Sequence, residues 1–283
     1  MRFLNAFLCL LLLICPCALC YGQVHFSSVH GERGYSALRG SVTWDLGKDV
    51  LFSPLVGYYR MSDTEQDEKG STSRYGAQVV YDWRDWLQGV VTVRWQPKAI
   101  GYQAVLYDAS LRWFPFYYWR GIKQPFVRVG MEQGRYRSLV NTEGERLPRT
   151  FREVDTSLQI ESGAQYHRWN LKAQWQKVLK YSEPVPAGIS FSWAEIPYLA
   201  AVMQGFVKEA TALRVGYATS VVTPYAGIVR YRYVHSNTDV FAVLAGLNVH
   251  LWGASFLGGV EVFEPRREEN RKTFFSLSVE AEL

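Results

Sequence analysis

Long runs in which apolar and polar residues alternate constrain this chain more than any other feature. In residues 87–96, Val91, Val93 and Trp95 alternate with polar neighbours, and residues 154–166 repeat the pattern. A repeat of two residues is that of a β-strand, because successive side chains point to opposite faces. The runs extend over about 10 to 13 residues, whereas strands of soluble proteins average about 5 to 6 and a tilted membrane-crossing strand needs about 9 to 11. Their length favours strands that cross a membrane.

Charged residues in the middle of the polar faces indicate which face is turned inward. Arg94 and Lys172 both lie within such runs. A membrane barrel turns its apolar face to lipid and its polar face to the lumen, the reverse of a soluble barrel. We therefore predict an all-β fold, a transmembrane antiparallel β-barrel. Its predicted lumen-lining residues are Arg94, Arg112, Arg128, Glu132, Glu161, Lys172, Arg214, Arg230, Arg232, Glu261 and Glu280.

Tryptophan and tyrosine collect where the predicted strands end. Trp83 and Trp86 flank one expected turn, Tyr166 and Trp169 flank another, and Trp252 lies at a third. Aromatic residues are enriched at both interfaces between a membrane and water. The alternative, aromatic side chains scattered through a soluble core, does not concentrate them beside turns.

The connections between the predicted strands alternate in length. Compact turns are expected at residues 47–48, 84–85, 167–168, 221–222 and 253–254. Longer polar links are expected at residues 62–73, 138–150, 182–205, 235–239 and 265–272. Short periplasmic turns and long outside loops are typical of outer-membrane barrels. The apolar content of residues 182–205 predicts that this link packs, either as a gate in the barrel mouth or as a further hairpin of the wall.

Fourteen strands follow when the C-terminus is placed on the side of the short turns. They are expected near residues 23–31, 35–46, 50–61, 74–83, 87–96, 102–113, 125–137, 151–166, 169–181, 206–220, 223–235, 239–252, 254–264 and 272–283. Twelve or sixteen strands are the alternatives, because the first strand is weak and residues 189–203 have the length of another hairpin. The apolar stretch 240–263 resembles a transmembrane helix in length, but its glycines and a turn near Trp252 predict a hairpin.

The first residues predict export from the cytoplasm. Arg2 precedes an apolar run from Phe3 to Leu19, and polar, strand-like sequence follows. We interpret residues 1–22 as a cleaved signal peptide and residues 23–283 as one barrel domain, with an uncleaved anchor helix as the alternative. All four cysteines, Cys9, Cys15, Cys17 and Cys20, lie in this leader. Disulfides therefore play no part in the predicted mature chain.

The charge distribution argues against nucleic acid as a partner. The chain has 31 Lys and Arg residues against 26 Asp and Glu residues. Both signs alternate along the whole chain, whereas a nucleic-acid binder concentrates its basic residues in a patch.

The C-terminal sequence, residues 274–283, resembles the last strand of Gram-negative outer-membrane β-barrel proteins, although it ends in Leu rather than the usual aromatic residue. In that class this strand is the signal recognised by the barrel-assembly machinery. The resemblance implies a location in the bacterial outer membrane and contact with outer-membrane lipid and lipopolysaccharide. It also implies an outward row formed by Phe275, Leu277, Val279, Ala281 and Leu283.

A lumen lined by both signs of charge has two interpretations. One is a water-filled, porin-like channel for small polar or anionic solutes. The other is a non-conducting barrel with a structural, assembly or surface-interaction role, in which interior charges pair and close the lumen. In that second case Arg128, Arg230 and Arg232 pair with the acids Glu132, Glu161 and Glu261.

A barrel hydrolase acting on lipid or peptide is a third hypothesis, and we do not expect it. His235 and Ser236 are adjacent, so an extended strand directs them to opposite faces. His250 is expected to face the lumen near Glu261 on the next strand. The sequence contains no H-E-x-x-H motif or calcium-loop spacing, and we predict neither a metal nor a cofactor.

Overall fold

A closed wall of antiparallel strands surrounds a single lumen. The computed structural model describes residues 22–31, 36–63, 68–99, 102–116, 118–140, 146–181, 207–233, 239–264 and 272–282. The strands are β1 (Gly22–Gly31), β2 (Ser36–Asp45), β3 (Val50–Asp63), β4 (Glu68–Arg84), β5 (Leu87–Ala99), β6 (Tyr102–Trp113), β7 (Tyr118–Trp119), β8 (Ile122–Val140), β9 (Arg146–Tyr166), β10 (Trp169–Tyr181), β11 (Val207–Tyr217), β12 (Val222–Tyr233), β13 (Asp239–Leu251), β14 (Ala254–Glu264) and β15 (Lys272–Glu282). Among the described residues no helix has the length and apolar character needed to span a bilayer.

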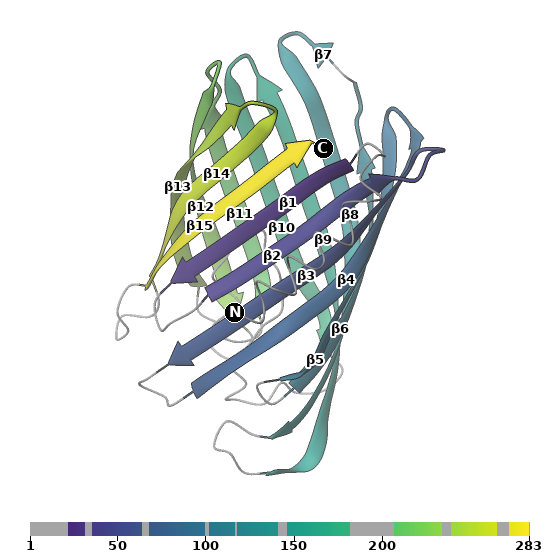
Figure 1. The fold of residues 1–283 in the computed structure, drawn as a ribbon, viewed down its shortest axis with the longest axis vertical. Helices are drawn as coiled ribbons and strands as arrows, with labels where there is room; N and C mark the ends of the chain where they lie inside the picture. The colour runs from purple at the N-terminus through teal and green to yellow at the C-terminus, as the bar shows by residue number, and fades with distance from the viewer. Residues whose placement is uncertain are drawn as a thin grey trace.

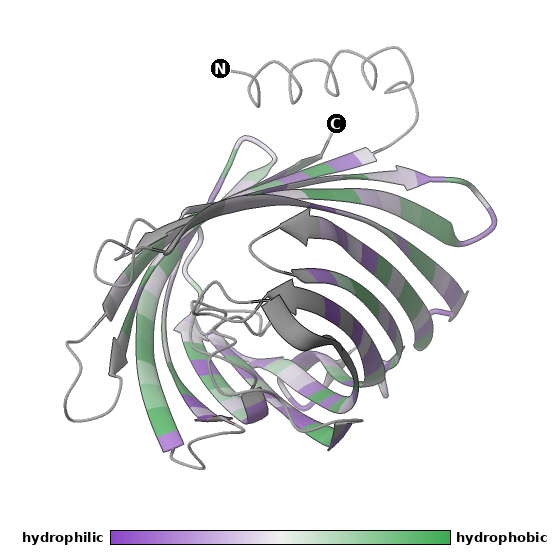
Figure 2. Cartoon of the chain, turned by 90° about the horizontal axis from the view of Figure 1, so that it is seen from below, coloured by the Kyte–Doolittle hydropathy of each residue, from purple (hydrophilic) through white to green (hydrophobic). Residues whose placement is uncertain are grey.

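Pairing between the first and last strands closes the wall. Each long strand pairs with its neighbour in sequence, and β1 pairs with β15 from Gln23 opposite Glu282 to Gly31 opposite Phe274. Figure 1 shows these two strands, purple and yellow, side by side, and Figure 2 shows the wall end-on. The two-residue β7 folds back on β8, while β6 pairs directly with β8. The wall therefore has fourteen strands, which confirms the predicted all-β membrane-barrel fold and its strand number.

Several strands continue further than the sequence pattern indicates. β4 begins at Glu68 instead of near residue 74, because its ladder with β3 extends to Asp63 opposite Glu68. β9 likewise begins at Arg146. Charged, turn-type residues still pair there because the partner strand is long enough to supply the backbone hydrogen bonds. The expected leader, the link 182–205 and the pair His235–Ser236 fall outside the described residues.

The two faces of the wall differ in exposure and chemistry. On β5, Val91 is 54% exposed whereas Thr92 is 6% exposed. The same division holds on β8, where Val129 is exposed and Glu132 is buried. Green and purple bands alternate along the strands in Figure 2. Apolar side chains that form the outside of a barrel meet lipid, so their exposure here marks the lipid-facing surface.

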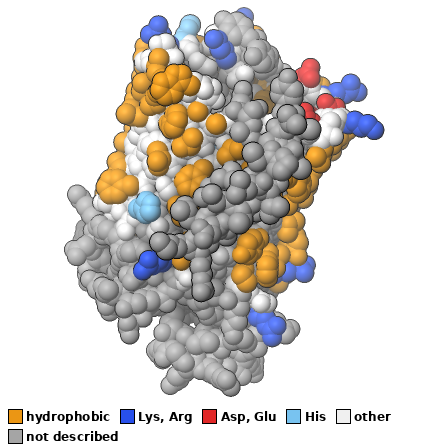
Figure 3. Space-filling view, in the orientation of Figure 1, with side chains coloured by type: hydrophobic (Ala, Val, Ile, Leu, Met, Phe, Trp, Pro, Cys, Tyr) orange, Lys and Arg blue, Asp and Glu red, His pale blue; other side chains and the backbone are white. Residues whose placement is uncertain are grey.

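Aromatic side chains encircle the end of the barrel that carries the short turns, which we call the turn end. Trp83, Trp86, Trp113, Trp119 and Trp169 are each about half exposed there. Toward the opposite end, which we call the loop end, exposed aromatics are Tyr75, Trp95, Tyr107 and Phe241. The rings of Tyr75 and Trp95 stack at a centroid distance of 5.9 Å. Apolar side chains cover much of the visible wall in Figure 3. Two aromatic zones separated by an apolar band match the two interfaces of a bilayer.

The tight turns obtain their shape from residues in left-handed backbone conformations. Trp252 and Gly253 have φ angles of 52° and 77°, the signature of a two-residue hairpin turn whose twist matches that of the strands. This turn divides the apolar stretch 240–263 into β13 and β14, as predicted. The compact link 115–124 contains a similar reversal, with positive φ at Arg120 and Gly121, which turns β7 back onto β8.

The facing of β13 generates a depth-dependent prediction. Leu247 is half exposed and lies between Phe241 and Trp252, whereas Leu251 is next to the turn. Leu247→Arg should lower the free energy of unfolding by about 2 to 4 kcal/mol and Leu251→Arg by about 0 to 1 kcal/mol, because the cost of a lipid-facing cation falls toward the interface. Urea unfolding of the two variants in lipid vesicles measures both values. Equal losses would contradict the assigned membrane position.

Candidate functional site in the lumen

A chain of ion pairs follows the inner wall across β6, β8, β9 and β10. The Arg128 guanidinium lies 3.1 Å from an oxygen of Asp108 and 3.8 Å from an oxygen of Glu161. Lys172 Nζ lies 2.6 Å from the other Glu161 oxygen. Arg128 and Glu161 are direct cross-strand neighbours, so the register itself brings them together. We call these four residues the ionic row.

A second interior pair links strands that are not adjacent. Arg94 on β5 donates to Glu132 on β8 across β6. Both side chains are largely shielded, and Glu132 is 5% exposed. A carboxylate this deeply buried requires a charged or hydrogen-bonding partner. The contact between Arg128 and Glu161 is one that the ionic-plug hypothesis expected, whereas Glu132 pairs with Arg94, which that hypothesis did not include.

The other predicted lumen residues have separate surroundings. Arg112 donates to Gln88 at 3.3 Å and lies over the Phe126 ring at 5.3 Å. Arg214 lies over the Tyr225 ring at 4.6 Å and lines a cavity of about 250 Å³ near the turn end. Glu280 shares the inward face of β15 with Ser278 and lies opposite His25.

Arg230 and Arg232 do not line the lumen, and this part of the prediction is wrong. Both share the outward face of β12 with Ile228, while Val229 and Tyr231 are fully buried on the inward face. The side chains of Arg230 and Arg232 are 40% and 32% exposed. At the loop end both pair with Asp239, at 2.7 and 2.9 Å. Long cationic side chains are stable on the lipid side there because their heads reach the headgroup region.

Glu261 also lacks the predicted arginine partners. It faces inward on β14, opposite Leu244 on β13 and Phe274 on β15. The inward face around it is apolar, which the alternation of β13 did not indicate because both faces of that strand are apolar. The buried residues of this apolar sector are Ala210, Ala212, Val229, Tyr231, Val240, Ala242, Leu244 and Phe274.

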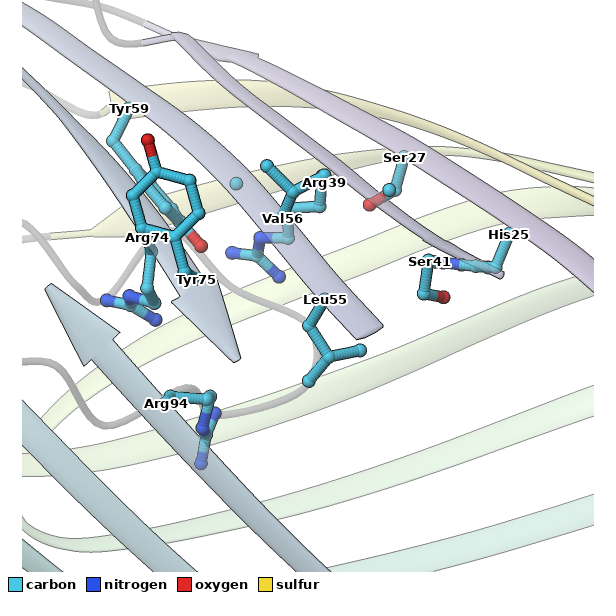
Figure 4. A pocket seen from close by; sticks show the side chains of 12 residues that line it. His25, Ser27, Arg39, Ser41, Leu55, Val56, Tyr59, Arg74, Tyr75 and Arg94 are labelled. Carbon is cyan, nitrogen blue, oxygen red and sulfur yellow. The ribbon is translucent and has the colours of Figure 1, made fainter. Parts of the chain in front are cut away.

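Three residues that sequence reasoning missed form a cationic cavity on β2, β3 and β4. Arg39, Tyr59 and Arg74 line it together with Arg94 and His25 (Figure 4). Arg74 was missed because the predicted strand began at residue 74, which placed it at a strand end instead of inside the barrel. Arg39 shares one face of its strand with Ala37 and Ser41, and this spacing of two residues could have identified it as facing inward.

The structure separates His250 from Glu261, and His235 lies outside the described residues. His250 lines the turn-end cavity and contacts Asn248 at 3.2 Å. It pairs with Ser255, whereas Glu261 pairs with Leu244, so the two are six residues apart along the strand, or about 20 Å. The expected proximity of His250 and Glu261 is therefore wrong. Within the described residues, no group of His, Cys, Asp and Glu is arranged to hold a metal ion.

The last strand presents a row of alternate apolar side chains outward. Phe275 and Leu277 are 60% and 49% exposed, and Val279 and Ala281 follow on the same face. Leu283 lies outside the described residues. The row implied by the resemblance is thus available on the outer surface over its described length.

Solved structures of Gram-negative outer-membrane proteins share this architecture. The toluene transporter TbuX of Ralstonia pickettii superposes with a TM-score of 0.55 at 10% identity, covering 93% of this chain and 89% of that one. A FadL homologue of Pseudomonas aeruginosa gives 0.51 at 9% identity, covering 92% and 89%. CdiB of Acinetobacter baumannii gives 0.52 at 7% identity over 92% of this chain, which spans 60% of CdiB. The chain has the fold of outer-membrane β-barrels.

No protein-family model and no curated protein sequence matches the chain. At these low identities the structural likeness shows the fold, and one fold hosts many functions. What passes through or binds in the barrel has to be argued from its own lumen residues.

The ionic row predicts measurable coupling between Glu161 and Lys172. In a double-mutant cycle, Glu161→Gln and Lys172→Gln should show a coupling energy of about 0.5 to 3 kcal/mol in the free energy of unfolding, since each removes the same short contact. Glu280→Gln combined with Lys172→Gln is the control cycle and should be additive, because Glu280 lies on a distant strand. Additivity in both cycles would show that the row contributes no pairwise stabilisation.

Proposed function

We propose that this protein is a bacterial outer-membrane channel that passes small polar solutes and favours anions. The observation that carries the proposal is the division of the wall into an apolar, lipid-facing surface and an inward surface bearing Arg39, Arg74, Arg94, Arg128 and Lys172. A closed sheet satisfies its backbone hydrogen bonds within the membrane, and charged side chains along the lumen select permeating ions.

The structure of the barrel surface also favours a location in the bacterial outer membrane. The membrane-barrel fold, the exposed aromatic zones and the outward row of β15 all suit the bacterial outer membrane. The solved structures with the same fold come from outer-membrane proteins, among them a transporter. A selective channel supplies a use for the arginines that face the lumen.

A non-conducting barrel is the second candidate, and the ionic row favours it. Asp108, Arg128, Glu161 and Lys172 bind one another across the inner wall, as they would in a packed plug. The apolar sector on β11 to β13 is equally suited to covering by protein. Such a barrel would act through its loops and rims in envelope structure or assembly.

Ion conduction separates the two candidates. The refolded chain in a planar bilayer should give discrete, stable current steps, and under a salt gradient the reversal potential should shift toward that of the anion. Arg94→Gln should weaken this shift because it removes one lumen cation, while Arg60→Gln, on the outer face, should leave it unchanged. A correctly folded barrel that passes no current would establish the non-conducting candidate.

Lipopolysaccharide and the barrel-assembly machinery are the partners we propose outside the lumen. The outward row of β15 suits recognition during assembly. At the loop end the outer surface carries more cations than acids among the described side chains. Its cations include Arg60, Arg135, Arg137, Lys177, Arg230 and Arg232, and its acids are Glu209 and Asp239. Phosphate groups of outer-leaflet lipopolysaccharide complement such a cationic zone.

Lipopolysaccharide binding can be measured on the detergent-solubilised barrel. The double variant Arg135→Gln and Arg137→Gln should bind lipopolysaccharide roughly tenfold more weakly, because charge-assisted contacts to phosphate are lost. The matched control is Arg84→Gln with Arg168→Gln, two exposed arginines at the turn end. Equally weakened lipopolysaccharide binding in both double variants would indicate unspecific charge attraction. It would refute the proposal that the cations at the loop end form the binding site.

A further inference from the structure

One cavity in the lumen wall is lined by three guanidinium groups. It has a volume of about 230 Å³ and lies against β1 to β5. Its charged lining consists of Arg39, Arg74 and Arg94, with His25 at one side. In Figure 4 the three arginine side chains, from β2, β4 and β5, extend into the same space. The lining residues that the structure describes contribute no carboxylate.

The register of three strands sets the spacing of two of these arginines. Arg39 on β2 and Arg74 on β4 both lie directly opposite Gly57 on β3. Neighbouring strands are about 4.8 Å apart, so the two backbones are separated by roughly 10 Å. The glycine between them has no side chain, which leaves space on the inward face between the arginines.

The Tyr59 ring occupies part of that space and contacts both guanidinium groups. An alanine Cβ at position 57 would lie 2.9 Å from the Tyr59 ring, so the ring lies back over the glycine. The guanidinium carbons of Arg39 and Arg74 are 5.6 and 4.8 Å from the ring centroid. Contact with an aromatic ring attracts a guanidinium group and restricts its rotamers. Tyr59 is itself 6% exposed, so this support is built into the wall.

Arg94 completes the group from the next strand. It lies opposite Gly76, and a Cβ at that glycine would be 3.1 Å from Arg94 Cγ. The Arg94 side chain therefore crosses a glycine in the same way as Tyr59 does. Its contact with Glu132 directs one end of the guanidinium toward β8, and the cavity lies on the side of Arg39 and Arg74.

We infer that this cavity is a binding subsite for small solutes that carry a carboxylate or phosphate group. Guanidinium forks match the planar oxygens of carboxylates and the oxygens of phosphates, and charge-assisted hydrogen bonds are strengthened where water is scarce. Arg39 and Arg74 bind the oxyanion, and the guanidinium group of Arg94, which also contacts Glu132, borders the same space. The Tyr59 ring restrains the forks of Arg39 and Arg74, and Gly57 leaves room for that ring. The inference rests on the proposed channel function and names the class of solute that pauses in the lumen.

Direct binding tests the subsite without any current measurement. Isothermal titration of the refolded full chain in detergent, at low ionic strength, uses citrate and inorganic phosphate as probes and glucose as the neutral comparison. The wild-type chain should bind at least one of the two anions and not glucose. Arg39→Gln and Arg74→Gln should each weaken binding by roughly tenfold or more, the effect of losing one charge-assisted hydrogen bond. The relative affinities for citrate and phosphate distinguish a carboxylate site from a phosphate site.

Two control variants make the test specific. Arg135→Gln removes an arginine that stacks on Tyr107 on the outer face, so it should leave anion binding unchanged. Gly57→Ala keeps every charge but displaces the Tyr59 ring, and it should weaken binding, whereas Gly258→Ala, where the added methyl meets open space, should not.

Each result has a definite meaning. Absence of citrate and phosphate binding to the folded wild-type chain, or an equal loss in Arg135→Gln and Arg39→Gln, overturns the subsite. A barrel that conducts but binds neither anion refutes the subsite and leaves the channel function standing. A barrel that binds an anion with the expected arginine dependence but conducts no current refutes the channel function and retains the site.

Discussion

The structure depends on one constraint: every backbone hydrogen bond in a membrane-crossing strand has to be made within the protein. An open sheet leaves two unpaired edges, and in hydrocarbon each unpaired group costs several kcal/mol. Pairing of β1 with β15 removes both edges. Once the ring is closed, each strand has one face toward lipid and one toward the lumen, so the alternation of side chains becomes a division between two solvents.

Closure also decides how interior charges are accommodated. The lumen has an ionic row on β6 to β10, a cationic cavity on β1 to β5 and an apolar sector centred on β11 to β13. In the ionic row, neighbouring strands supply opposite charges at the same level, as with Arg128 and Glu161. In the cationic cavity, the Tyr59 ring contacts the guanidinium groups of Arg39 and Arg74, and Arg94 pairs with Glu132. The three sectors give the barrel an interior of uneven chemistry, which is the basis for proposing selectivity.

The fold that this chain shares with solved structures does not identify its ligand. A toluene transporter and a FadL homologue have the same architecture at about one residue in ten identical. Residues on the lipid face are constrained by the membrane in all such barrels, whereas lumen residues are free to differ with the solute. The arginines, Tyr59 and Gly57 are therefore the features of this chain that carry an argument about its own ligand.

The sequence by itself determined the class of fold and most of the wall. Period-two runs, the length of the strands and the tight turns follow from local backbone geometry, and these features predicted fourteen strands and the facing of residues such as Val91, Thr92 and Arg94. They failed at Arg230 and Arg232, because Ile228 on one face and Val229 on the other are both apolar and the alternation is ambiguous there.

Only the tertiary structure decided which inward residues meet. Alternation assigns a residue to a face of its own strand, but the contact between Arg94 and Glu132, and the placement of Arg39 and Arg74 on either side of Gly57, depend on register across several strands. Register is fixed by the ladders and by closure of the whole ring, which are long-range properties. The contacts between side chains in the lumen therefore depend on the closed barrel, in which the first and last strands pair.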